Sequence, residues 1–199
     1  MGSPVFNTGG AALGVARWVR LPCAPATHDA RRYDRRMTSG APDPTAVEAY
    51  LHEHIPISAA MGIEVTSAGP AEVALTAPLE PNVNHRSTVF GGSCASVAIL
   101  AAWTLAHLRV APAGPSRVVI QQGSTDYLLP IRGAFTATCR LADEDVWDRF
   151  LRTLVRFGRA RIELEATVTS DGATVATFHG TYVALAGPAE EAWPAMIEP

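Results

Sequence analysis

The feature that most constrains this chain is a run of small and apolar residues at positions 94–108, which contains no ionised side chain and follows Gly91 and Gly92. A helix that is apolar on every side must be buried, in a membrane or in a protein core. A membrane span needs about 20 apolar residues, whereas this run carries Thr104 and His107 and lies among amphipathic patterns. We therefore expect a core helix and no membrane span.

On both sides of this run, apolar residues alternate with polar ones, which is typical of half-buried strands. Two pairs of these segments flank turn sequences, Ala68-Gly69-Pro70 and Asp171-Gly172, and are expected to form hairpins. The patterns predict strands at residues 63–66, 73–77, 117–122, 124–131, 135–141, 160–169 and 173–185.

Two further helices are predicted. The first begins near Thr45, with Asp43 or Thr45 as its cap, and ends before Pro56. The second starts after a cap at Asp143 and stops at Gly158. Its apolar stripe, expected to be core or an interface, consists of Val146, Trp147, Phe150, Leu151, Leu154 and Val155.

These elements predict an α+β domain at residues 45–186, in which an antiparallel sheet wraps the apolar helix. Residues 1–44 are rich in Arg, Pro and Gly and are expected to be a disordered extension. Their Arg-rich start also fits a transit peptide, or an upstream extension before a true start at Met37. We favour the tail or the false start over targeting, and expect residues 187–199 to be a loose tail.

Composition narrows the function classes. A formal charge of −3 does not favour a nucleic-acid partner. All sixteen basic residues are arginine, which excludes a lysine Schiff base and a P-loop lysine. Cys23, Cys94 and Cys139 are too few and too scattered for a disulfide framework or a zinc cluster. We expect a cytoplasmic protein without a metal.

The segment that could carry chemistry precedes the apolar helix. The amides of Gly91 and Gly92 would be unpaired at the positive end of the helix dipole, where they could stabilise negative charge on a carbonyl oxygen. Asn84 and His85 lie just upstream, and His can act as a base near neutral pH. Equally, the glycines could serve helix–sheet packing, with Asn84 and His85 as turn residues.

Two nearby residues have simpler interpretations. Ser93 is expected to be the helix N-cap and not a nucleophile, because its surroundings lack the Gly-x-Ser-x-Gly elbow. Cys94 is expected to be a buried structural thiol.

Three runs carry a resemblance to a known family: residues 54–62, residues 84–93 and Tyr-Leu-Leu-Pro at 127–130. With Trp103 and residues 150–162, they resemble the hot-dog-fold thioesterases, most closely the YiiD carboxy-terminal type, over residues 45–186. The resemblance implies a homodimer or dimer of dimers, with sites at the subunit interface. It also implies acyl-thioester substrates, with coenzyme A or acyl carrier protein as part of the substrate and no other cofactor.

We expect Asn84, His85, Gly92 and Asp126 to be catalytic. The expected substrate contacts are Thr88, Phe90, Gly91 and Ser93.

One departure matters for this assignment. Many hot-dog thioesterases have an acidic residue on the central helix at the position of Ile99, and this helix has no acid. Asp126 is the best substitute, although a solvated acid at a strand edge is an equal interpretation. Two alternatives to hydrolysis therefore stay open, namely a hot-dog dehydratase or hydratase and a non-catalytic acyl-thioester-binding module.

Overall fold

The computed structural model describes residues 42–187, so the expectations for residues 1–41 and 188–199 lie outside it. The longer helices and the strands follow the predicted order, whereas α3 and two 3₁₀ turns were not predicted. The elements are α2 (Pro44–His54), α3 (Pro56–Ala60), β1 (Glu64–Ala68), β2 (Glu72–Ala77), the 3₁₀ turn η1 (Glu80–Asn82), α4 (Gly91–Val110), the 3₁₀ turn η2 (Ala111–Ala113), β3 (Ser116–Tyr127), β4 (Phe135–Arg140), α5 (Glu144–Phe157), β5 (Arg159–Ser170) and β6 (Ala173–Ala186).

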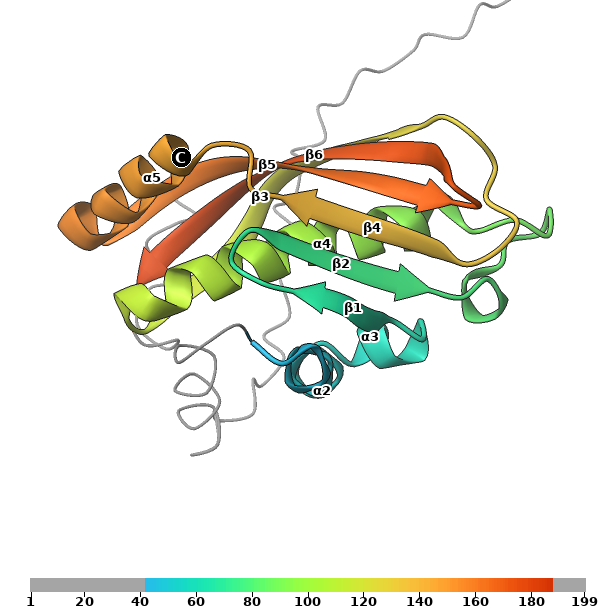
Figure 1. The fold of residues 1–199 in the computed structure, drawn as a ribbon, viewed down its shortest axis with the longest axis horizontal. Coiled ribbons are helices and arrows are strands. Elements are labelled where there is room, and N and C mark those ends of the chain that lie inside the picture. Colours follow the sequence, from blue (N-terminus) through green and yellow to red (C-terminus); the bar gives the residue numbers. More distant parts are fainter. Residues whose placement is uncertain (1–41, 188–199) are drawn as a thin grey trace, which may run out of the picture.

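The six strands form one antiparallel sheet in the order β1-β2-β4-β5-β6-β3, and α4 runs across one face of it (Figure 1). Five of the six strands contact α4, because the sheet curves around the helix. The predicted α+β architecture, an antiparallel sheet wrapped around a long apolar helix, is confirmed.

The helix α4 is the centre of the hydrophobic core. Val97, Ala101 and Leu105 are completely buried and lie along one side of the helix. Ala102 and Ala106 are also completely buried and extend the buried surface to a second side. The segment Gly91–Ala113 is long and apolar enough to cross a membrane, but 61% of its most apolar window is buried inside the protein. Since the sheet covers that surface, α4 is a buried core helix.

The strand β3 differs from the prediction. Residues 117–122 and 124–131 were expected to be separate strands, but β3 is continuous from Ser116 to Tyr127 and has a bulge between Ile120 and Gln122. A bulge adds one residue without ending the pairing, and β3 stays paired with β6 along its whole length. Among the described residues, no strand pairs with its other edge.

The helices α2 and α5 are capped by residues that the sequence predicted as caps. Asp43 accepts a hydrogen bond from the Thr45 amide at 3.0 Å, and Asp143 accepts one from the Asp145 amide at 2.8 Å. Gly158 ends α5 with a φ of 68°, which glycine adopts without strain.

The expected apolar stripe of α5 is only partly buried. Trp147, Phe150 and Leu154 pack against the sheet, but Val146 and Val155 are exposed. The expected core role is therefore confirmed for Trp147, Phe150 and Leu154, whereas an interface role for the exposed part of the stripe stays a prediction.

Candidate functional site

The first turn of α4 has no side-chain cap. Phe90 is the N-cap residue, so the expected capping role of Ser93 is wrong, and Ser93 lies inside the first turn. The first helix amide with a backbone partner is that of Cys94, which donates to the Phe90 carbonyl at 3.1 Å. The amides of Gly91, Gly92 and Ser93 have no hydrogen-bond partner in the described part of the chain. They are therefore available to a ligand at the positive end of the helix dipole.

Two aromatic rings lie against the glycines at this point. A Cβ on Gly92 would come within 2.3 Å of the Phe90 ring, and one on Gly91 would come within 3.4 Å of the Tyr127 ring. The Tyr127 hydroxyl donates to the Gly91 carbonyl at 2.9 Å. The glycines therefore provide room for aromatic side chains at the start of the helix.

The loop before α4 is held by two asparagines. Asn82 is buried, and its side-chain amide donates to the carbonyls of Met61 and Pro78, both at 2.8 Å. The Asn84 side-chain oxygen accepts from the Arg86 amide at 2.8 Å. Both side chains therefore organise the loop.

Asn84 and Thr88, both predicted site residues, contact each other. The Asn84 side-chain nitrogen donates to the Thr88 hydroxyl at 3.0 Å and to the Val89 carbonyl at 3.1 Å. His85 is exposed at the tip of this turn, and no other described residue hydrogen-bonds to its ring. The structure thus presents His85 to solvent on a loop that Asn84 and Thr88 stabilise.

A pocket of about 340 Å³ opens beside the start of α4. It is lined by Val89, Gly91, Cys94, Tyr127, Leu128, Leu129, Pro130 and Ile131. Gly91 is the only predicted site residue in this lining. The others lie outside it: Asn84, His85, Thr88, Phe90, Gly92, Ser93 and Asp126.

Large apolar side chains surround this opening and remain exposed. Phe90 is 57% exposed and Tyr127 is 55% exposed, and Leu128 and Leu129 are exposed as well. Exposed apolar groups that gather in one place mark ligand or partner surfaces. The sequence reasoning assigned no site role to Tyr127, Leu128 or Leu129. The signal was present, because strand alternation stops there and three large apolar residues follow one another.

Asp126 lies close in sequence to this pocket but on the other face of the sheet. Side chains alternate between the faces of a strand, and the adjacent residue Tyr127 reaches the start of α4. Asp126 is therefore directed away from α4, and it is exposed.

Cys94 forms part of the pocket wall and is 1% exposed. Burial raises the pKa of its thiol to about 11, so the thiol is neutral at physiological pH. This confirms the expected structural role, because the thiolate is the nucleophilic form of cysteine.

Within residues 42–187, no group of three or more His, Cys, Asp or Glu side chains could hold a metal ion.

Known proteins resemble this chain in sequence and in fold. Residues 44–186 match the model of a family described as putative thioesterase, YiiD carboxy-terminal type. A structure from Chlorobaculum tepidum, of a protein with unknown function, is 32% identical with a TM-score of 0.68, and the match covers 72% of this chain and 97% of that one. A putative thioesterase from Shewanella oneidensis is 27% identical with a TM-score of 0.64, and the match covers 72% and 97% of the two chains.

A third structure supports the fold alone. It is a Pseudomonas aeruginosa protein described as a probable thioesterase, 21% identical with a TM-score of 0.62, and the match covers 74% of this chain and 100% of that one.

Proposed function

Because this chain belongs to the YiiD carboxy-terminal family of putative thioesterases and has the hot-dog fold, we propose that it hydrolyses acyl thioesters carried by coenzyme A or acyl carrier protein. The proposed location is the cytoplasm, where the free thiols of Cys94 and Cys139 stay reduced.

The observation that carries this proposal is the pairing of free amides with an apolar pocket. The amides of Gly91 and Gly92 have no partner among the described residues, and Gly91 lines the pocket. Its volume of about 340 Å³ lies at the small end of ligand pockets. Leu128, Leu129 and Ile131 would contact the acyl group, while the amides face its carbonyl oxygen.

The reaction adds water to the thioester carbonyl. His85 takes a proton from the water as its oxygen bonds to the carbonyl carbon, and the carbonyl oxygen becomes negative. The amides of Gly91 and Gly92 stabilise that charge, and losing one such donor typically costs about 3 kcal/mol of barrier stabilisation. The carbon–sulfur bond then breaks, and His85 returns the proton to the thiolate. The products are a carboxylic acid and a free thiol.

The other predicted residues take supporting roles. Asn84 positions the loop that carries His85, because its side-chain amide is already bonded to Thr88 and Val89. Phe90 offers an exposed ring to the substrate next to Gly92. Ser93 adds a third free amide in the first turn of the helix. We assign Asp126 no step within one protomer, since it lies on the opposite face of β3.

The proposal is tested by thiol release from a panel of acyl-CoA and acyl-carrier-protein thioesters. His85→Ala should lower kcat about 100-fold or more, because a positioned base contributes 10²–10⁴-fold. The matched control is His179→Ala, which removes another exposed histidine, on β6. That variant should keep the parent rate. No thiol release by the parent protein, or an unchanged rate in His85→Ala, would contradict the proposal.

A non-catalytic acyl-thioester-binding module is the second candidate. The observation in its favour is that α4 has no acid, and that Ile99 stands at the position where the resemblance to hot-dog thioesterases implies one. It predicts saturable binding of acyl-CoA with no free thiol and no change in the acyl group. A hot-dog dehydratase would instead change the absorbance of enoyl or 3-hydroxyacyl thioesters without releasing thiol.

A further inference from the structure

The pocket beside the start of α4 has an exposed rim and a buried bottom. The rim consists of side chains that are each more than half exposed, namely Tyr127, Leu128 and Leu129. The bottom consists of side chains that are buried, namely Val89, Cys94 and Ile131. Exposure falls from the rim to the bottom, so the pocket is open on one side and closed on the other.

Backbone hydrogen bonds hold both parts of this pocket in place. The Val89 amide donates to the Ile131 carbonyl at 2.9 Å, which joins two residues of the bottom. The amides of Leu128 and Leu129 both donate to the Val175 carbonyl, at 2.8 and 3.1 Å, which ties the rim to β6. The shape of the pocket is therefore set by ordered backbone before a ligand binds.

Cys94 closes the pocket along α4. It lies three residues after Gly91, so both residues are on the same face of the helix. Val97 and Ala98, which follow on the next turn, are completely buried and do not line the pocket. The pocket therefore spans one turn of α4, from the free amides at its start to the Cys94 side chain.

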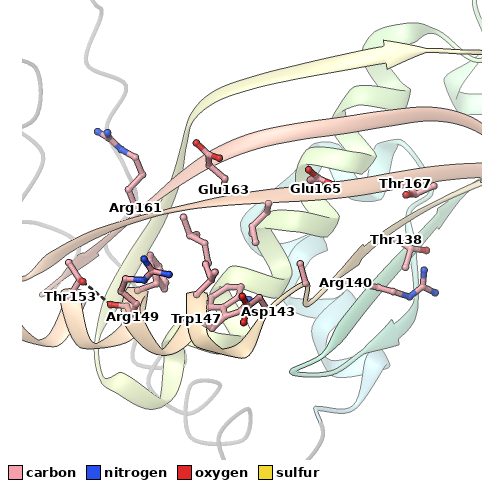
Figure 2. A pocket seen from close by; sticks show the side chains of 15 residues that line it. Thr138, Arg140, Asp143, Trp147, Arg149, Thr153, Arg161, Glu163, Glu165 and Thr167 are labelled. Atoms are coloured by element: carbon pink, nitrogen blue, oxygen red, sulfur yellow. Dashed lines mark hydrogen bonds between the residues drawn. The ribbon is translucent and has the colours of Figure 1, made fainter.

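A larger groove in the protein does not extend this pocket. It has a volume of about 780 Å³ and lies between α5 and β5 (Figure 2), and the described residues that line it include none of those that line the pocket. Figure 2 shows charged side chains of both signs along it, among them Arg149, Arg161, Glu163 and Glu165. An acyl chain that begins at the amides of α4 therefore ends at Cys94.

The length of the pocket limits the chain that it can hold. Gly91 and Cys94 are about 4.5 Å apart along the helix axis, at about 1.5 Å per residue. A carbonyl oxygen that accepts from the free amides lies about 2.9 Å from them. Carbon–carbon bonds of about 1.5 Å at an angle of about 111° advance an extended chain by about 1.3 Å per carbon. The total of about 7.4 Å therefore holds about six carbons.

We propose that Cys94 restricts the substrate to short acyl chains, of up to about six carbons, by closing the bottom of the acyl pocket. This inference rests on the proposed function, because it places the acyl carbonyl at the amides of Gly91 and Gly92. Each methylene group that fits is removed from water, which strengthens binding about fourfold. The next carbon beyond the limit meets the packed core at Val97 and Ala98.

The binding of S-alkyl pantetheine thioethers, from ethyl to dodecyl, tests this proposal. These compounds carry the arm that coenzyme A and acyl carrier protein share, and they contain no thioester, so the result does not depend on catalysis. Titration calorimetry should give an affinity that rises about fourfold per methylene group up to the hexyl compound and then stops rising. Thiol release from the corresponding acyl thioesters should depend on chain length in the same way.

Substitutions at Cys94 should move the limit in both directions. Cys94→Ala removes the sulfur atom from the bottom of the pocket, so the heptyl-to-hexyl ratio of affinities should rise about fourfold. Cys94→Met places a longer, adaptable side chain there, so the hexyl-to-butyl ratio should fall at least fourfold. Each ratio compares two ligands on one preparation, so partial unfolding of a variant does not change it.

The matched control is Cys139→Ala. This variant removes the same atom from a completely buried cysteine on β4, outside the pocket, and should leave both ratios unchanged.

Three results would overturn the proposal. The first is the absence of binding by every thioether. The second is an affinity that keeps rising to the dodecyl compound in the parent protein. The third is a limit that neither substitution at Cys94 moves. A limit at about six carbons without any thiol release would contradict the proposed hydrolysis and still support the role of Cys94.

Discussion

The fold lowers the pKa of His107, so the charge of this side chain differs between the folded and the unfolded chain at mildly acidic pH. It lies on α4 between two stacked rings, Trp103 at 4.9 Å and Tyr50 at 5.3 Å between centroids. His54 stacks on Tyr50 at 4.1 Å. Burial, and then the charge of His54, lower the pKa of His107 from 6.5 to about 4. The imidazole is therefore neutral at pH 7.

This pKa makes folding stability depend on pH. Below pH 6.5 the unfolded chain binds a proton at His107 that the folded chain excludes until about pH 4, so stability falls as the pH is lowered. Between pH 7.5 and pH 5 the loss attributable to His107 should be about 2 kcal/mol. Urea unfolding at the two pH values measures it. His107→Gln should flatten the dependence by this amount, and an equally steep dependence would contradict the assignment.

At the scale of elements, α5 is attached to the end of α4 by one aromatic side chain. Trp147 is 1% exposed and meets Phe150 edge to face at 5.4 Å. The Arg109 guanidinium, near the end of α4, lies 5.1 Å from the Trp147 ring centre and pairs with Glu144 at 2.5 Å. The ion pair is partly exposed, so the buried ring contributes most to holding the helix.

Trp147→Ala should therefore lower the free energy of unfolding by about 3–5 kcal/mol, the usual cost of removing a large buried aromatic side chain. Val155→Ala is the control on the same helix, because Val155 is 72% exposed. Its effect should stay within about 0.5 kcal/mol. Urea unfolding compares the two variants, and equal effects would show that α5 does not depend on this packing.

At the scale of the whole molecule, β3 forms an open edge of the sheet. It has twelve residues, pairs only with β6 among the described strands, and is exposed from residue 120 to 127 except at the half-buried Thr125 (Figure 1). Long unpaired edges attract another strand. A second copy related by a two-fold axis would pair β3 with β3 and cover part of the opening near Tyr127.

Light scattering should therefore give two or four times the chain mass of 21.1 kDa. Ile120→Asp, on the exposed part of β3, should shift the population to monomer, since it would place a charge in the interface. Ile57→Asp changes an equally apolar exposed side chain on α3 and should leave the mass unchanged. A monomeric parent protein would contradict this prediction.

Much of the fold could be predicted because its signals are local. A helix without a polar face can only be buried, so the run around Ala101 predicted the core helix. The alternation of apolar and polar residues predicted the strands β5 and β6. Asp143 and Gly158 predicted the two ends of α5. The division of β3 into two strands was wrong because a bulge interrupts the alternation without interrupting the pairing.

Local patterns were sufficient to locate the apolar core helix, because helix and strand periods are properties of the local backbone, but they put its N-cap at Ser93 when the cap is Phe90. The contacts between side chains at the start of α4 follow from the tertiary structure. Tyr127 reaches Gly91 from 36 residues away, and Asp126 lies on the other face of the sheet. Such contacts depend on strand order and register, which a local pattern does not encode, since the chain must first fold before distant residues become neighbours.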